Sequence, residues 1–144
     1  MKPTLLIADG DAVVCELYRL FFAGRGYEVE TCTDGLDCLK KLRQATAAVL
    51  VLDRDLRWGG SDGVLAWLRE ERPTLGVSVI LTTTSGFPQD CADLIKHPVV
   101  DCLPKPFTLT VLLESVGAAV AKMGRIESSN SNDVPARLEL VIGG

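Results

Sequence analysis

The stretch that decides the fold is Ala48-Val49-Leu50-Val51-Leu52-Asp53, an unbroken apolar run that ends in a carboxylate. Apolar residues without alternation are typical of a strand that is covered on both faces, as in the parallel sheet of an α/β protein. Such sheets bind ligands just beyond the carboxyl ends of their strands. Asp53 is therefore the first candidate for the chemical centre, and other segments are expected to bring partners to the same edge.

Five apolar stretches have the length and composition of strands, and each is followed by a helical pattern. The strands are expected at Thr4–Ala8, Tyr27–Cys32, Ala48–Asp53, Val77–Leu81 and Val99–Leu103. Strands that alternate with helices require crossover connections, and these are right-handed in nearly all known cases. The sequence therefore predicts an α/β fold, with a doubly wound five-stranded parallel sheet and five helices on its two faces.

The first helix is expected to begin after Asp11, which suits the N-cap, and to end at Gly24 and Gly26. Its sequence allows two alternative apolar faces. One face contains Val14, Leu17 and Phe21, and the other contains Val13, Leu17 and Leu20. The second helix is expected to use Leu36, Leu39 and Leu42 in the same way.

Bulk properties narrow the classes of function. The chain has 144 residues and a formal net charge of −4, which suits one globular domain and argues against direct binding of nucleic acid or an anionic membrane. No apolar run is long enough to cross a bilayer, so the expected location is the cytoplasm. The five cysteines lack the spacing of a zinc site and are odd in number, which favours free buried thiols over disulfides.

The composition changes after Gly124. Residues 128–133 are polar, and the last residues include the strand-like Leu138-Glu139-Leu140-Val141-Ile142. We expect one domain over residues 1–124, followed by a polar linker and short tail over 125–144. The tail is either disordered, or docks on the domain, or adds a strand to a second copy, which would give a homodimer.

The predicted fold brings chemically different side chains to one edge of the sheet. They are Asp9 after the first strand, Asp53 and Asp55 after the third, Thr83 after the fourth and Lys105 after the fifth. Acids, a hydroxyl and an amine are thus expected around one pocket.

In this order the motifs resemble the receiver domain of two-component response regulators, the chemotaxis-regulator fold. The resemblance covers about Met1 to Met123. It is carried by Leu6-Ile7-Ala8-Asp9, Leu50-Val51-Leu52-Asp53, Ile80-Leu81-Thr82-Thr83 and Asp101-Cys102-Leu103-Pro104-Lys105-Pro106-Phe107. It implies a flavodoxin-like sheet with strand order 2-1-3-4-5.

The resemblance also implies a chemistry. Asp53 would accept a phosphoryl group from a sensor histidine kinase or a histidine phosphotransfer protein, and the chain would then regulate a downstream protein by changing conformation. Mg²⁺ would be held by Asp9, Asp53 and Asp55, the last of which contributes its backbone carbonyl in the family, and Lys105 would neutralise a phosphoryl oxygen. Thr83, rather than Thr82, would donate its hydroxyl to the acyl phosphate. Such a chain is a phosphoacceptor with self-catalysed transfer and hydrolysis, not an enzyme in the usual sense.

Several positions depart from the family pattern. Gly10 stands where the family has a second acid that ligates the metal, and Asp11 is better placed as an N-cap than as its replacement. The acidic side chain of Asp55 either compensates for Gly10 or adds repulsion. Cys102 takes the place of the family's rotating Tyr or Phe, and a thiol is too small for that role.

The loop after Asp53 is also altered, by an insertion around Trp58 whose indole either covers the pocket or packs on the neighbouring helix. These departures leave a second hypothesis open: a pseudo-receiver that binds a protein partner without phosphorylation. A small flavodoxin-like enzyme or nucleotide binder is disfavoured, because the sequence contains neither a P-loop nor a GxGxxG motif.

Overall fold

The computed structural model describes residues 2–57, 60–70, 76–84 and 88–131, with only the backbone of 88–90 and 124–131. Trp58 and the tail segment 132–144 therefore lie outside the described residues. The elements in chain order are β1 Thr4–Ala8, α1 Ala12–Ala23, β2 Glu28–Cys32, α2 Gly35–Gln44, β3 Val49–Asp53, α3 Gly60–Glu70, β4 Ser78–Thr83, α4 Pro88–Leu94, β5 Val99–Pro104 and α5 Leu109–Ser131.

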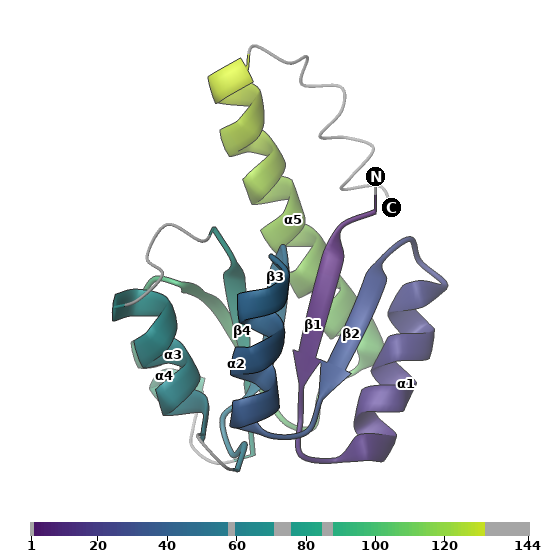
Figure 1. The fold of residues 1–144 in the computed structure, drawn as a ribbon, viewed down its shortest axis with the longest axis vertical. Helices are drawn as coiled ribbons and strands as arrows, with labels where there is room; N and C mark the ends of the chain where they lie inside the picture. Colours follow the sequence, from purple (N-terminus) through teal and green to yellow (C-terminus); the bar gives the residue numbers. More distant parts are fainter. Residues whose placement is uncertain (1, 58–59, 71–75, 85–87, 132–144) are drawn as a thin grey trace.

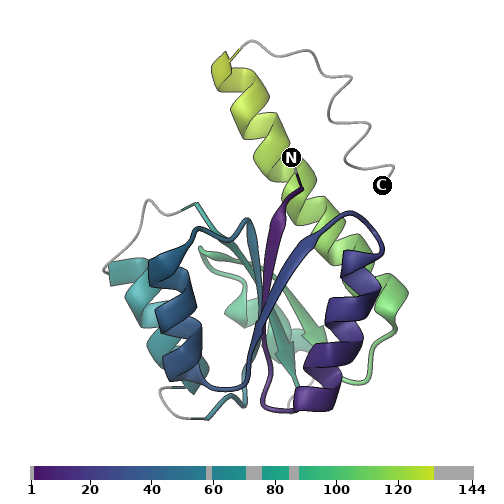
Figure 2. The same cartoon turned by 45° about the vertical axis from the view of Figure 1, so that its right-hand side comes forward.

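The five strands form one parallel sheet in the order β2-β1-β3-β4-β5, which confirms the predicted α/β architecture. β3 lies at the centre, and every residue from Val49 to Asp53 is buried. Apolar and polar residues do not alternate in this stretch because helices cover both faces of the sheet. Helices α1 and α5 cover one face and α2, α3 and α4 cover the other (Figure 1, Figure 2).

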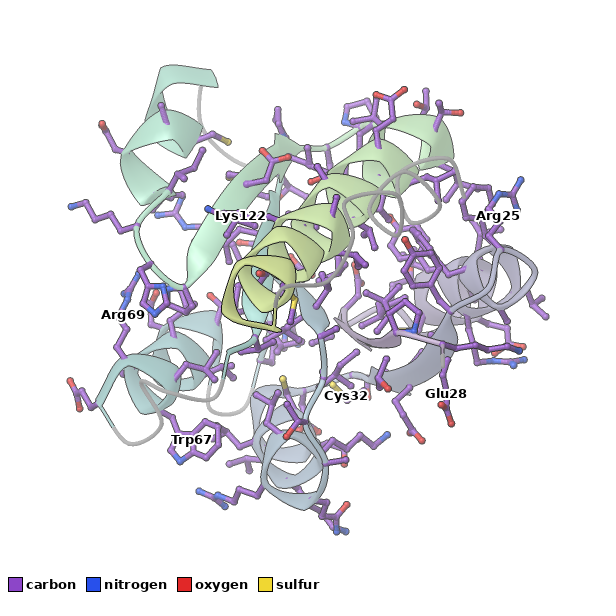
Figure 3. All side chains as sticks on the ribbon, turned by 90° about the horizontal axis from the view of Figure 1, so that it is seen from above. Arg25, Glu28, Cys32, Trp67, Arg69 and Lys122 are labelled. Atoms are coloured by element: carbon purple, nitrogen blue, oxygen red, sulfur yellow. The ribbon has the colours of Figure 1, made fainter. Side chains whose placement is uncertain are left out.

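Each face of the sheet has its own hydrophobic core. Alternate residues of β3 point to opposite sides, so Leu50 and Leu52 pack with α2, α3 and α4, whereas Val49 and Val51 pack with α1 and α5. Seen from above, Trp67 and Arg69 lie on the α3 side of the molecule, with Arg25 on the α1 side (Figure 3). Arg69 joins α3 to the α4–β5 connection, because its guanidinium donates to the His97 carbonyl at 3.0 Å.

The first apolar face proposed for α1 is right in part, because Val14 and Phe21 are partly buried and pack against the core, whereas the second face is exposed. The residues of α1 that are buried are Cys15, Tyr18 and Phe22. Val13, Leu17 and Leu20 are 78%, 52% and 60% exposed. The helix carries apolar residues on two sides, and periodicity alone does not say which side meets the sheet. In α2, Leu42 is buried and Leu39 partly buried as predicted, but Leu36 is exposed.

Helix α5 runs to Ser131, past the boundary expected at Gly124. The backbone of residues 125–131 is therefore helical, although the composition predicts a polar linker there. Polar residues tolerate helical geometry, and the first proline that would end the helix is Pro135. The end of α5 extends beyond the amino-end edge of the sheet, opposite the edge where the strands end (Figure 1).

Candidate functional site

Three charged side chains meet at the carboxyl ends of the strands, as the sequence predicts. The Lys105 Nζ atom lies 3.2 Å from Asp9 Oδ2 and 3.7 Å from Asp53 Oδ2. Asp9 and Asp53 are both buried, and the ammonium group lies within reach of the two carboxylates. A buried carboxylate is costly unless it is paired, so this lysine stabilises two ionised groups at once.

The parallel register explains why these residues meet. Ala8 is paired with Leu52, so Asp9 lies beside Asp53 at the ends of adjacent strands. The main-chain N–H of Asp11 donates to Asp9 Oδ1 at 2.8 Å and orients that carboxylate. On the other side of the site, the N–H of Lys105 donates to the Thr83 carbonyl at 2.7 Å.

The carboxylate of Asp53 is buried at the end of β3. Burial raises the pKa of its carboxyl group, and the Asp55 N–H, 3.0 Å from Asp53 Oδ1, and the Lys105 ammonium oppose that rise. Removing water destabilises the ionised form of a carboxylate, which makes its oxygen a better nucleophile. The environment therefore suits a reaction in which Asp53 attacks an electrophile.

Gly10 stands where the family has a metal-ligating acid, and the two nearby candidates to replace it, Asp11 and Asp55, are engaged in other hydrogen bonds. The carboxylate of Asp11 accepts hydrogen bonds from the N–H groups of Val13 and Val14, at 2.9 and 3.4 Å, which confirms its N-cap role. The carboxylate of Asp55 accepts a hydrogen bond from the hydroxyl of Thr84 at 2.6 Å. Within the described ranges, no three acidic, cysteine or histidine side chains gather closely enough to hold a metal ion.

The remaining donors still fit a hydrated magnesium ion. Mg²⁺ keeps several of its waters and binds through one or two carboxylates, and Asp9 and Asp53 present two at the same place. With Lys105 counted, these three side chains carry a formal charge of −1, which attracts a cation. The site thus suits a weakly held, largely hydrated ion rather than one enclosed by protein ligands.

Hydroxyl groups follow along the end of β4. Thr82 is the register partner of Asp53, and both Thr82 and Thr83 are buried. Strand alternation places Thr83 on the same side of the sheet as Leu81 and Cys102, which belong to the core beneath α2, α3 and α4. Cys102 thus lies on the same side of the sheet as Thr83, the predicted switch residue. It is a small buried residue of the core, where the family has a rotating Tyr or Phe.

The cysteines are core residues, as the sequence predicts. All five are free and buried. Burial raises the pKa of Cys15 to about 11 and that of Cys102 to about 12, so both thiols stay protonated at neutral pH. The Cys15 thiol donates to the Asp9 carbonyl at 3.3 Å and helps to fix the end of β1.

Sequence reasoning missed Thr84 as a member of this site. The run Thr82-Thr83-Thr84 indicates hydroxyls at the end of β4, but it does not show which acid each hydroxyl meets. The contact with Asp55 depends on the path of two loops, which no local pattern encodes.

Comparisons with known proteins agree with this geometry. Residues 5–117 match the family described as "Response regulator receiver domain". The chain is 30% identical over 128 residues to a CpxR homolog of Haemophilus influenzae described as a transcriptional regulatory protein, covering 89% of this chain and 55% of that protein. It is 27% identical to the regulatory protein VanRB of Enterococcus faecalis, covering 88% of this chain and 56% of that protein. The chain thus spans about half the length of these relatives.

Solved structures show the same fold. The signal receiver domain of a LuxO repressor protein from Vibrio parahaemolyticus superposes with a TM-score of 0.80 at 22% identity, covering 91% of this chain and 98% of that one. The chemotaxis response regulator CheY4 of Vibrio cholerae gives a TM-score of 0.72 at 22% identity, covering 83% and 99%. With the family match over residues 5–117, these findings establish that the chain belongs to the response regulator receiver domain family.

Proposed function

We propose that the chain is a phosphorylation-dependent signalling switch whose phosphoacceptor is Asp53. The observation that carries this proposal is the position of the Lys105 ammonium group, within 4 Å of the buried carboxylates of Asp9 and Asp53. An incoming phosphoryl group spreads negative charge over its oxygens beside an anionic nucleophile. Lys105 supplies positive charge at that place without any rearrangement of the fold.

In the proposed reaction a carboxylate oxygen of Asp53 attacks the phosphorus of a phosphohistidine on the kinase or phosphotransfer protein. A new O–P bond forms, the N–P bond breaks, and its electron pair leaves with the imidazole. When bound by Asp9, Asp53 and the Asp55 segment, Mg²⁺ would supply charge neutralisation at the phosphoryl oxygens. The N–H of Asp55 orients the attacking carboxylate through Oδ1. We assign to Thr83 the hydroxyl that binds the product and moves toward it.

A docking surface for the phosphodonor is suggested by three exposed apolar residues of α1, Val13, Leu17 and Leu20. Val13 lies in the first turn, beside the pocket edge where Asp11 caps the helix. Apolar side chains of this size on a helix face favour a protein partner that covers them while it reaches the pocket. We therefore propose that the phosphodonor protein docks on this face.

The output is proposed to be a change of affinity for a downstream protein in the cytoplasm. The net charge of −4 does not favour direct contact of this domain with nucleic acid. The described part of the chain contains no helix that is long and apolar enough to span a membrane. Residues 1–124 remain the proposed receiver unit. A homodimer, in which the 125–144 segment adds a strand to a second copy, remains a prediction.

The proposal is tested by incubating the chain with acetyl phosphate and Mg²⁺ and measuring its intact mass. We expect the mass of one phosphoryl group on the wild-type chain and none on Asp53→Asn. Asp93→Asn serves as the matched control, because it removes an exposed carboxylate of α4 that is not part of the site and should still be phosphorylated. Equal uptake by Asp53→Asn would exclude Asp53 as the acceptor.

A second candidate function, a phosphorylation-independent pseudo-receiver, is favoured by one observation. Gly10 leaves two acids at the site, and Lys105 already lies close to both. If this candidate holds, Mg²⁺ titration will show no binding at millimolar concentration, and partner affinity will be the same for the wild-type chain and Asp53→Asn.

A further inference from the structure

Thr84 and Asp55 join the two loops that border the pocket. The hydroxyl of Thr84, just after β4, donates to Asp55 Oδ2 at 2.6 Å. The main-chain N–H of Asp55 donates in turn to Asp53 Oδ1 at 3.0 Å. Thr84 is therefore linked to the proposed phosphoacceptor through a single residue.

The core does not restrict the carboxylate of Asp55 to this position. Asp55 and Thr84 are both exposed, so a rotation of the Asp55 side chain would break its bond to Thr84 and leave the core unchanged. Asp55 is two residues from Asp53, and its main chain is already hydrogen-bonded to that carboxylate. A divalent cation beside Asp53 would attract this third carboxylate, and more so because Gly10 provides none.

We propose that Thr84 is a positioning residue, whose hydroxyl holds the Asp55 carboxylate away from the cation and competes with the cation for it. This inference rests on the proposed function, because it concerns the ion that would serve phosphorylation of Asp53. It explains why Asp55 does not complete a group of three acids within the described residues.

The competition has a consequence for the switch. Two described hydrogen bonds tie the β3–α3 loop to the end of β4: the Thr84–Asp55 bond, and the bond from the Arg54 N–H to the Thr82 carbonyl at 2.8 Å. When the cation captures Asp55, the first bond is lost and the second remains. The end of β4 is then held by one described hydrogen bond fewer, while the Lys105 N–H still donates to the Thr83 carbonyl at 2.7 Å.

The experiment measures the Kd of the full chain for Mn²⁺ by the electron paramagnetic resonance signal of the free ion. Thr84→Val removes the hydroxyl and keeps the branched shape, and it should bind Mn²⁺ on the order of fivefold more tightly, because Asp55 is released to the ion. Thr84→Ser keeps a hydroxyl and should match the wild-type chain. Combining Thr84→Val with Asp55→Asn should give the same Kd as Asp55→Asn alone.

Unchanged or weaker Mn²⁺ binding by Thr84→Val would overturn the inference, as would a gain that persists with Asn at position 55. If the wild-type chain binds Mn²⁺ and takes up a phosphoryl group while position 84 has no effect, only this inference fails. If no variant binds Mn²⁺ and Asp53 takes up no phosphoryl group, the proposed function fails with it.

Discussion

At the scale of single residues, the site is defined by the two carboxylates, Asp9 and Asp53, that lie next to the ammonium group of Lys105. Its ammonium group is 3.2 Å from Asp9 and 3.7 Å from Asp53, so each carboxylate depends on the same cation. Burial raises the pKa of Asp53, which means that ionising this group costs stability in the folded state. Keeping the Asp53 carboxylate ionised in this buried place therefore lowers the free energy of unfolding.

The difference in stability between the wild-type chain and Asp53→Asn should therefore depend on pH. Because the pKa of Asp53 is raised on folding, its contribution to stability is complete below the ordinary value of 3.8 and is lost as the pH rises through the raised pKa. We expect Asp53→Asn to unfold at a higher temperature than the wild-type chain at pH 7, with the difference shrinking as the pH falls toward 3.8. Thermal unfolding in buffer with a chelator checks this, and a difference that is independent of pH would contradict it.

Position 10 offers a direct test of the missing acid. The nearest atom to an added Cβ at Gly10 is the Thr33 carbonyl oxygen, 4.0 Å away, so a side chain fits. Gly10→Asp should bind Mg²⁺ about tenfold more tightly, because it adds a third carboxylate to the site. Isothermal titration measures the affinity, and Gly10→Asn is the uncharged control. An equal gain from both variants would show that charge is not the cause.

At the scale of elements, α1 has two different faces with different roles. The buried face contacts the sheet through Cys15, Tyr18 and Phe22, whereas Leu17 and Leu20 are exposed. Phe22 is fully buried, so Phe22→Ala should lower the free energy of unfolding by about 3–5 kcal/mol. Chemical denaturation measures this loss. A change below about 1 kcal/mol would show that this face is not part of the core.

Charging the exposed face should affect partners and leave the fold intact. Leu17→Glu is expected to change stability by no more than about 0.5 kcal/mol, because Leu17 is 52% exposed. It should slow phosphotransfer from a phosphodonor protein about tenfold or more and leave acetyl phosphate uptake unchanged. Val111→Glu, at a 41% exposed position on α5, is the control. Equal slowing with both phosphodonors would contradict a docking role for α1.

At the scale of the whole molecule, sequence was sufficient for the architecture. Apolar runs such as residues 48–53, turn residues such as Gly24 and the N-cap at Asp11 are local signals that can be read from the sequence alone. The meeting of Asp9, Asp53 and Lys105 also followed, because parallel strands end at one edge. The choice between the two apolar faces of α1 did not follow, because both sides of the helix carry apolar residues. The Thr84–Asp55 contact did not follow because it depends on loop paths.

The central claim is that Asp53, held beside Lys105 and Asp9, is the residue that becomes phosphorylated. The most direct measurement is to phosphorylate the wild-type chain with acetyl phosphate and Mg²⁺, reduce the acyl phosphate with borohydride, and locate the resulting homoserine by peptide mass spectrometry. The account predicts homoserine at position 53 alone. Homoserine at position 9 or 55, or at no position, would contradict it.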